Sequence, residues 1–257
     1  MGFNIKLWMD KIYNVIIYNN GFHRDYTNQI NMNERTNHMK QYYEAYEERY
    51  KAVHQLGIQW AEKGPTPIVE NMIHKYNISK NTKVLEIGCG EGRDAIYLHN
   101  NGYNVYGTDI SQEAVNYCIA KSGYKNFFQL DAVNGSTNEK FDYIYAIAVI
   151  HMLVLDDDRK KFLQFIKKHI NNNGYALICS MGDGNEESET DIRHAFDTVD
   201  RIHESSNMHV RVAATSCRKV KWTTFEKEIG YANLNIIEKG TIHDVPGFDS
   251  MMYIVVQ

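Results

Sequence analysis

From residue 83 onward, short apolar runs alternate with amphipathic segments. The apolar runs predict five strands, at 83–87, 104–108, 126–129, 142–147 and 175–181. Between them, apolar residues at helical spacing predict helices at 92–100, 112–121 and 156–173. Strands and helices that alternate in this way are typical of a parallel sheet. After a helix near 223–229, the apolar runs 233–238 and 250–256 indicate an antiparallel pair that closes the sheet.

The N-terminal part of the chain has a different pattern. Residues 1–38 are rich in Asn, Tyr and Met without sustained periodicity, so no element is predicted there. From Met39 to Glu62, apolar residues recur at three- and four-residue steps among charged ones, which predicts an amphipathic helix. We therefore expect a helical extension over 1–64 and a core domain over 65–257 with an insert at about 183–222.

Composition narrows the class of protein. With 257 residues, 43% of them hydrophobic and three prolines, the chain is expected to form one folded α/β domain with appended elements. A net charge of -4 provides no broad basic surface for nucleic acid, and no apolar run approaches the roughly 20 residues that cross a bilayer. The four cysteines form no CxxC pair, so neither a zinc site nor a disulfide framework is expected, and a reducing cytoplasm is the expected location.

The strongest chemical signal is VLEIGCGEGRD at 84–94, where a buried strand leads into a glycine-rich turn and then a helix. Glycine lets a ligand approach the backbone closely. The turn lies at the carboxyl end of the strand beside a helix N-terminus, where open α/β sheets bind nucleotides. The same glycines would also suit tight packing of strand and helix, so the turn alone leaves both interpretations open.

Two carboxylates flank this turn. Asp109 ends the next strand about 20 residues on, where it can accept hydrogen bonds from both ribose hydroxyls, although it could instead cap the following helix, as could Ser111. The turn reads G-x-G-x-G and not the dinucleotide pattern G-x-G-x-x-G, which disfavours NAD. Glu86 offers negative charge to a cationic ligand such as a sulfonium compound, or else forms a buried salt bridge, for instance with Arg93.

Four segments occur in the order of one known family: LEIGCGEG at 85–92, GTDIS at 107–111, QLDA at 129–132 and FDYIYAIAVIHML at 141–153. Through them the chain resembles the class I S-adenosylmethionine-dependent methyltransferases, of the small-molecule type that includes thiopurine- and tellurite-resistance-like enzymes. The resemblance is specific over about 80–155 and silent about 183–222. It implies a Rossmann-like, seven-stranded, mostly parallel sheet with an antiparallel last strand and helices on both faces.

The resemblance also implies a set of cofactor-binding residues. The glycines of the first segment would pack against the methionine and ribose, and the acid after the second strand would bind the ribose hydroxyls. The acid after the third strand would lie near the adenine amino group. The residues expected to bind S-adenosylmethionine, and its product S-adenosylhomocysteine, are Glu86, Gly88, Cys89, Gly90, Asp109, Ile110, Asp131, Ala132 and Ala146.

Methyl transfer is an in-line displacement, so the protein mainly has to align the nucleophile and exclude water, and no metal is expected. His151, just beyond the fourth strand, is the candidate catalytic base if its pKa lies near neutral. The alternative is that His151 only orients the backbone or packs in the core.

The insert is expected to cover the carboxyl edge of the sheet and to contact the substrate. Its segment TDIRHAFDTVDRIHE, at 190–204, has a spacing that predicts a helix with His194, Asp197 and Arg201 close together. A solvated helix face with salt bridges is the alternative. In similar enzymes the N-terminal helices close over the cofactor, so residues 1–64 are a candidate lid. The candidate substrate-binding residues are Tyr46, Asp183, Arg193, His194, Arg201 and His203.

The predicted function is metal-free transfer of a methyl group from S-adenosylmethionine to an O, N or S atom of a small molecule. A nucleic-acid base acceptor is disfavoured, because AIAVIHML at 146–153 stands where those enzymes carry Asn or Asp before Pro-Pro and an aromatic residue. We expect a monomer or homodimer without membrane or nucleic-acid partners. Two alternatives remain: an NAD(P)-dependent oxidoreductase, and a noncatalytic ligand-binding protein that keeps the fold.

Overall fold

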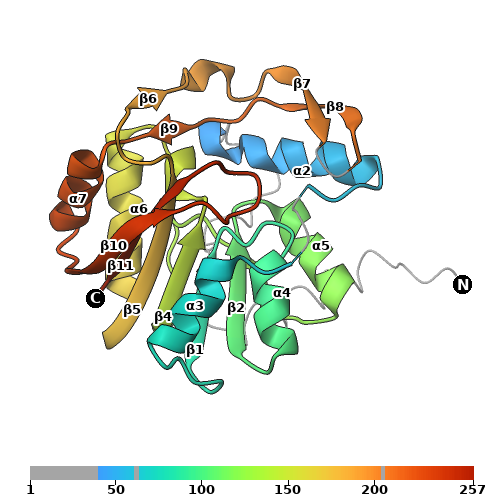
Figure 1. Ribbon diagram of the computed structural model, residues 1–257. Coiled ribbons are helices and arrows are strands. Elements are labelled where there is room, and N and C mark those ends of the chain that lie inside the picture. The colour runs from blue at the N-terminus through green and yellow to red at the C-terminus, as the bar shows by residue number, and fades with distance from the viewer. Residues whose placement is uncertain (1–39, 61–63, 204–205) are drawn as a thin grey trace, which may run out of the picture.

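The computed structural model describes residues 40–60, 64–203 and 206–257. The predictions for residues 1–39, including most of the N-terminal extension, lie outside the described residues. The core is a seven-stranded sheet in the order β10-β11-β5-β4-β1-β2-β3 (Figure 1). Its strands are β1 (Lys83–Ile87), β2 (Asn104–Asp109), β3 (Phe127–Gln129), β4 (Phe141–Ile147), β5 (Ile170–Met181), β10 (Ile236–Ile242) and β11 (Met251–Val256).

The sheet is mostly parallel. Strands β3, β2, β1, β4 and β5 pair in parallel, whereas β11 pairs antiparallel with both β5 and β10. The chain leaves β1 in one direction toward β2 and β3 and then returns to β4 on the other side of β1. Ligands of open α/β sheets bind at such a reversal, outside the carboxyl ends of the strands. The predicted Rossmann-like sheet with an antiparallel last strand is confirmed.

Helices cover both faces of the sheet, as predicted. Successive side chains along β1 point to opposite faces of the sheet. On one face, Val84 joins a core with helices α3 (Pro67–Lys75), α4 (Arg93–Asn100) and α5 (Gln112–Ser122). Leu85 joins a second core with α6 (Asp156–His169) and α7 (Trp222–Tyr231). Each fully buried Leu or Val side chain stabilises such a core by about 1.5–3 kcal/mol. Helix α6 ends before the predicted residue 173, because Ile170 already pairs with Phe141 in the sheet.

A cap lies over the carboxyl ends of the parallel strands. It consists of a 3-10 turn (Tyr42–Glu44), helix α2 (Ala45–Gln55) and the insert after β5, whose strands β7 (Thr198–His203) and β8 (Met208–Ala213) lie beside α2 (Figure 1). Val53 of α2 packs against Val210 and Val212 of β8. Two short strands, β6 (Ser188–Glu189) and β9 (Arg218–Lys219), pair nearer β5.

The predicted helix over 190–204 is wrong. A single 3-10 turn (Ile192–His194) is followed by β7, which pairs antiparallel with β8 through residues 198–203. Alternate residues of a strand share a face, so Val199 and His203 lie on the same face of the β7–β8 pair. This face is the one that packs on α2 and the residues that follow it. Tertiary packing against α2 therefore selects the strand.

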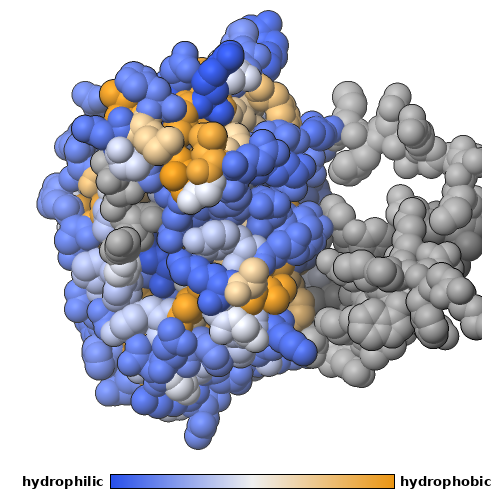
Figure 2. Space-filling model, turned by 90° about the vertical axis from the view of Figure 1, so that its right-hand side faces the viewer, coloured by the Kyte–Doolittle hydropathy of each residue, from blue (hydrophilic) through white to orange (hydrophobic). Residues whose placement is uncertain are grey.

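The surface carries no broad apolar area on the face in Figure 2, where hydrophilic residues predominate and hydrophobic ones form small separate groups. In the described part of the chain, no helix combines the length and apolar character needed to cross a bilayer.

Candidate cofactor and substrate site

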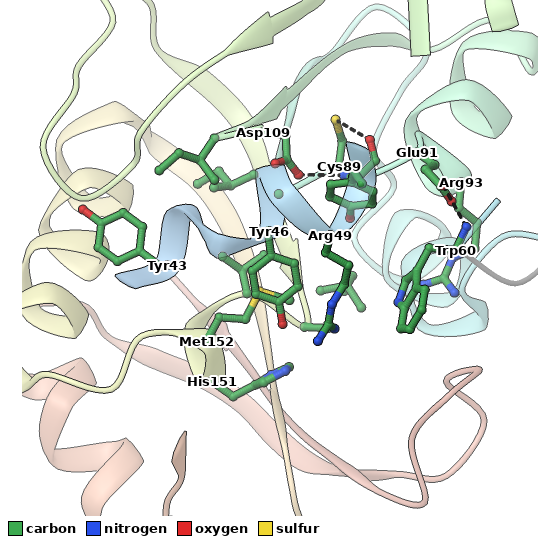
Figure 3. Close-up of a pocket in the computed structure, with 18 of the residues that line it drawn as sticks. Tyr43, Tyr46, Arg49, Trp60, Cys89, Glu91, Arg93, Asp109, His151 and Met152 are labelled. Carbon is green, nitrogen blue, oxygen red and sulfur yellow. Dashed lines mark hydrogen bonds between the residues drawn. The ribbon is translucent and has the colours of Figure 1, made fainter. Parts of the chain in front are cut away.

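A cavity of about 540 Å³ opens beneath the cap at the carboxyl edge of the sheet (Figure 3). Its floor is formed by the segments that follow β1, β2, β3 and β4, and its roof by α2, the end of β7 and residues 246–248. Small-molecule sites commonly have volumes of 300–1,000 Å³. The cavity lies at the chain reversal beside β1, where the sequence predicted a ligand.

The glycine-rich turn forms one wall of this cavity with its backbone. Gly88 and Gly90 have positive φ angles of 72° and 53°, which other residues rarely adopt. A Cβ atom on Gly88 would lie 2.4 Å from Cγ2 of Val149, and one on Gly90 would lie 2.7 Å from the hydroxyl of Tyr50. Both contacts are with residues that line the cavity. At these two positions glycine therefore keeps the cavity open, whereas Gly92 lies against Cys118 and serves packing.

Asp109 ties the end of β2 to this turn. One carboxylate oxygen accepts the amide hydrogen of Gly90 at 2.8 Å, and the other accepts that of Ser111 at 2.8 Å. Ser111 itself caps α5 by accepting a hydrogen bond from Ala114. The capping alternative for Asp109 is therefore not needed, and its carboxylate faces the cavity. Burial raises the pKa of Asp109 to about 6, against the lowering effect of the two amide hydrogens.

Glu86 lies deeper, at the end of β1. It is buried, and the hydroxyl of Tyr145 donates to its Oε2 at 3.0 Å. Burial and the neighbouring charge of Asp94 raise the pKa of Glu86 well above its ordinary value. The ion pair of Arg93 in the described part of the chain is with Asp94, at 3.7 Å, so the alternative of a salt bridge between Arg93 and Glu86 is not formed.

The turn after β3 closes the far end of the cavity. Asp131 accepts amide hydrogens of Val133 and Asn134 through Oδ1, and its Oδ2 lies 3.4 Å from the hydroxyl of Tyr43. Ile110 and Ala132 also line the cavity, as does Cys89 of the glycine-rich turn. Ala146 does not line the cavity: it is fully buried within the sheet, because its side chain points to the face that α6 covers.

His151 also lines the cavity, from a 3-10 turn (Ile150–Met152) that follows β4. It is 2% exposed, and its Nδ1 lies 3.3 Å from the amide nitrogen of Met181. Burial lowers the pKa of His151 to about 3, and the charge of Arg159 adds to this effect. The near-neutral pKa expected of a base is therefore absent. Because Nδ1 accepts the amide hydrogen, the hydrogen-bond pattern assigns the ring hydrogen to Nε2.

Three of the six candidate substrate residues come together at the cavity. Tyr46, Arg201 and His203 line it from α2 and β7. Asp183, Arg193 and His194 are exposed and do not line it. For Arg193 and His194 the reason is that their segment does not form the predicted helix. The side chains of all three instead contact neighbours in sequence, Asn185, Asp191 and Asp197 respectively.

Several lining residues were not predicted from sequence. Arg49 is 8% exposed and lies between the rings of Tyr46 and Trp60, 5.2 and 5.0 Å from their centroids (Figure 3). Its place three residues after Tyr46, in phase with the apolar positions of the predicted helix, is the signal that could have revealed it. Phe248 packs edge-on against His151 from the β10–β11 connection, and no local pattern marks it.

Comparison with known proteins agrees with this geometry. Residues 85–176, from β1 to β5, match the sequence profile of a family described as "Methyltransferase domain". Over 121 residues the chain is 27% identical to a protein of Haemophilus influenzae named "Probable S-adenosyl-L-methionine-dependent methyltransferase TehB". That match covers 45% of this chain and 41% of the Haemophilus protein, so the chain matches less than half the length of this relative.

Two solved structures share the fold. A S-adenosylmethionine-dependent methyltransferase from Clostridium acetobutylicum superposes with a TM-score of 0.57 at 17% identity, over 81% of this chain and 95% of that chain. The second is the 1,6-didemethyltoxoflavin-N1-methyltransferase of Burkholderia thailandensis, with bound 1,6-didemethyltoxoflavin and S-adenosylhomocysteine. It superposes with a TM-score of 0.60 at 13% identity, over 82% of this chain and 86% of that chain. Over residues 85–176 the chain is therefore similar in sequence to a methyltransferase domain, and its fold is that of these S-adenosylmethionine-dependent methyltransferases, in agreement with the four sequence segments.

Proposed function

We propose that this protein transfers a methyl group from S-adenosylmethionine to an O, N or S atom of a small molecule. The observation that carries the proposal is the buried Asp109 carboxylate, fixed beside Gly90 and facing the cavity. A carboxylate at this place in an open α/β fold accepts hydrogen bonds from ribose hydroxyls. The matched methyltransferase profile covers the same strands and supports this assignment.

The residues of the cavity fit the cofactor along its length. Asp109 would hold the ribose, and Ile110, Asp131 and Ala132 would surround the adenine. The backbone at Gly88 and Gly90 would contact the methionine part, with Glu86 and Arg93 available to its ammonium and carboxylate groups. When bound, the cofactor supplies a methyl group activated by a sulfonium charge. The protein has to hold the acceptor in line with that methyl group and keep water away.

The cap supplies the means to exclude water. Two side chains of α2 fasten it to the floor of the cavity: Glu47 accepts a hydrogen bond from Ser111 at 2.6 Å, and His54 contacts Glu91 at 2.9 Å and Glu113 at 2.8 Å. Residues 40–60 of the proposed lid thus bind to the glycine-rich turn and to the start of α5. In this proposal α2 covers the cofactor, and the insert with α2 contacts the acceptor.

Titration calorimetry with S-adenosylmethionine, S-adenosylhomocysteine and NAD tests the cofactor. Binding of the first two without NAD supports the proposal; binding of NAD alone favours an oxidoreductase, and no binding by folded protein contradicts the proposal. A ligand at 100 times its Kd should also raise the free energy of unfolding by about 2.7 kcal/mol. Release of S-adenosylhomocysteine with a panel of small metabolites then separates an enzyme from a noncatalytic ligand-binding protein.

We expect binding of S-adenosylhomocysteine to weaken below pH 6. The ionised form of Asp109 accepts the ribose hydroxyls, and its pKa is about 6, so protons compete with the ligand. The Kd at pH 5 should be roughly tenfold higher than at pH 7, measured by calorimetry between pH 5 and 8. In the Asp109→Asn protein this pH dependence of the Kd should vanish. A Kd that stays constant in the natural protein would contradict the assignment.

The contribution of Asp109 to the folding stability of the free protein has the opposite dependence on pH. The folded-state pKa of Asp109 lies above its ordinary value of 3.8, so the folded protein binds the proton more tightly than the unfolded chain. The stability that Asp109 contributes is therefore full below about pH 4 and is lost as the pH rises through about 6.

His151 is assigned a role as hydrogen-bond donor to the acceptor molecule, not as a base. We expect His151→Ala to lower kcat roughly 10- to 100-fold while the Kd of S-adenosylhomocysteine stays within about twofold. His151→Gln, which keeps a donor, should retain more activity than the alanine variant. Because the pKa of His151 is about 3, the kcat profile of the natural protein between pH 5 and 8 should contain no histidine step. Such a step, lost in His151→Gln, would restore the base assignment.

The remaining parts of the proposal concern the setting of the protein. A cytoplasmic location is supported by four cysteines that are all free. A net charge of -4 supports a small-molecule acceptor over nucleic acid. A monomer or homodimer is proposed.

A further inference from the structure

The roof of the cavity carries positive charge that no carboxylate of the described residues pairs with. Arg49 of α2 and Arg201 of β7 both line the cavity, and neither forms an ion pair with any described residue. The guanidinium of Arg49 donates through Nε and Nη2 to the carbonyl oxygens of Ala213 and Ala214 and to the hydroxyl of Thr215. Its Nη1 has no partner in the described part of the chain, so one edge of a nearly buried cation remains available.

The two guanidinium groups act on each other. Burial lowers the pKa of Arg49, and the positive charge of Arg201 lowers it further. Arg49 is nearly buried and Arg201 is exposed, and two like charges this close are unfavourable until a ligand brings the opposite charge. Arg49 is held in place by the rings of Tyr46 and Trp60, so its orientation is set before any ligand arrives.

The carboxylates of the cavity lie elsewhere. Asp109 and Asp131 belong to the segments assigned to ribose and adenine, and Glu86 lies at the deep end near Arg93. The two other lining acids already have partners: Glu91 accepts from the amide of Trp60, and Asp94 accepts from Thr66. The cavity is therefore divided by charge, with acids around the proposed cofactor position and, at the roof, cations that have no ion-pair partner among the described residues.

From this division we infer that the methyl acceptor carries an anionic group, a carboxylate, that binds to Arg201 and Arg49, with an apolar body between Tyr46 and Phe248. This inference rests on the proposed function, because it names the substrate class of the same site. Planar guanidinium groups bind carboxylates through paired hydrogen bonds. Tyr46, Trp60 and Phe248 supply flat apolar surface beside them.

Matched pairs of acids and amides test the inference. Protein saturated with S-adenosylhomocysteine is titrated with benzoate and benzamide, indole-3-acetate and indole-3-acetamide, and nicotinate and nicotinamide, by calorimetry and thermal shift. Acids should bind and amides of the same shape should not. Arg201→Met should weaken acid binding about tenfold or more, because a charge-assisted hydrogen bond is lost. The Kd of S-adenosylhomocysteine should stay unchanged.

Arg211→Met is the matched control. Arg211 lies on the neighbouring strand β8, is 77% exposed and does not line the cavity. The Arg211→Met protein should bind acids as the natural protein does. Amides that bind as well as acids, an acid series that fails to bind at millimolar concentration, or an unchanged acid affinity in Arg201→Met would each overturn the inference. Failure to bind S-adenosylhomocysteine at the outset would instead refute the proposed function.

Discussion

Replacement of Asp109 by alanine should weaken S-adenosylhomocysteine binding by about 100-fold or more. Each hydrogen bond from a ligand hydroxyl to a buried carboxylate is worth about 1.5–3 kcal/mol, and two ribose hydroxyls are available. A loss of about 2.7 kcal/mol already corresponds to 100-fold in Kd. Asp109 also accepts the amide hydrogen of Gly90, so the variant loosens the turn that contacts the ligand. Calorimetry at pH 7.5 measures the change directly.

Two further variants separate binding from folding in this experiment. Asp109→Asn keeps the size and one acceptor oxygen, and we expect a loss between those of the natural protein and Asp109→Ala. Asp183→Ala removes an exposed carboxylate outside the cavity and should leave the Kd unchanged. The melting temperature without ligand shows whether each variant is folded. A folded Asp109→Ala protein with normal affinity would remove the ribose assignment.

The core of the fold was readable from local pattern. Strand β1 was predicted at 83–87 and occurs there, because a continuous apolar run bounded by turn residues suits a strand buried on both faces. Helices α4 and α5 each begin and end within one residue of their predicted limits. Asp109 was placed correctly beside the glycine-rich turn because the length of a βα unit fixes the spacing between the ends of neighbouring parallel strands.

The roof of the cavity was not readable in the same way. Residues 190–204 carry a spacing that suits a helix, yet contacts with α2, more than 140 positions earlier, select a strand. Arg49 is likewise placed by the carbonyl oxygen of Ala213, 164 residues away. Local periodicity contains no information about partners at such separations. The positions of the roof residues were therefore predicted less accurately than those of the segments that follow β1, β2 and β3.

The charge states of buried residues were also not predicted from the sequence. His151 and Glu86 were both identified, but their expected charge states depended on ordinary pKa values. Desolvation shifts both groups toward their neutral forms, lowering the pKa of His151 and raising that of Glu86. Burial arises from the assembly of the cap over the sheet, so a residue's own neighbours in sequence do not reveal it.

Gly88→Ala should lower the free energy of unfolding by about 2–5 kcal/mol and abolish measurable cofactor binding. The left-handed backbone of Gly88 costs about 1–2 kcal/mol for a residue with a Cβ atom. The added atom would lie 2.4 Å from Cγ2 of Val149, and overpacking of this kind typically costs a further 1–3 kcal/mol. Urea unfolding measures the stability, and calorimetry with S-adenosylhomocysteine measures the binding.

Gly123→Ala isolates the backbone contribution. Gly123 has nearly the same φ angle, 71°, but a Cβ atom there would meet nothing within 4 Å, so we expect a loss of only about 1 kcal/mol. The double variant Gly88→Ala with Val149→Ala removes the clashing methyl group and should recover part of the loss, which appears as a coupling energy of about 0.5–3 kcal/mol in a double-mutant cycle. Equal losses in Gly88→Ala and Gly123→Ala, or additive effects at residues 88 and 149, would mean that the contact with Val149 does not constrain this wall of the cavity.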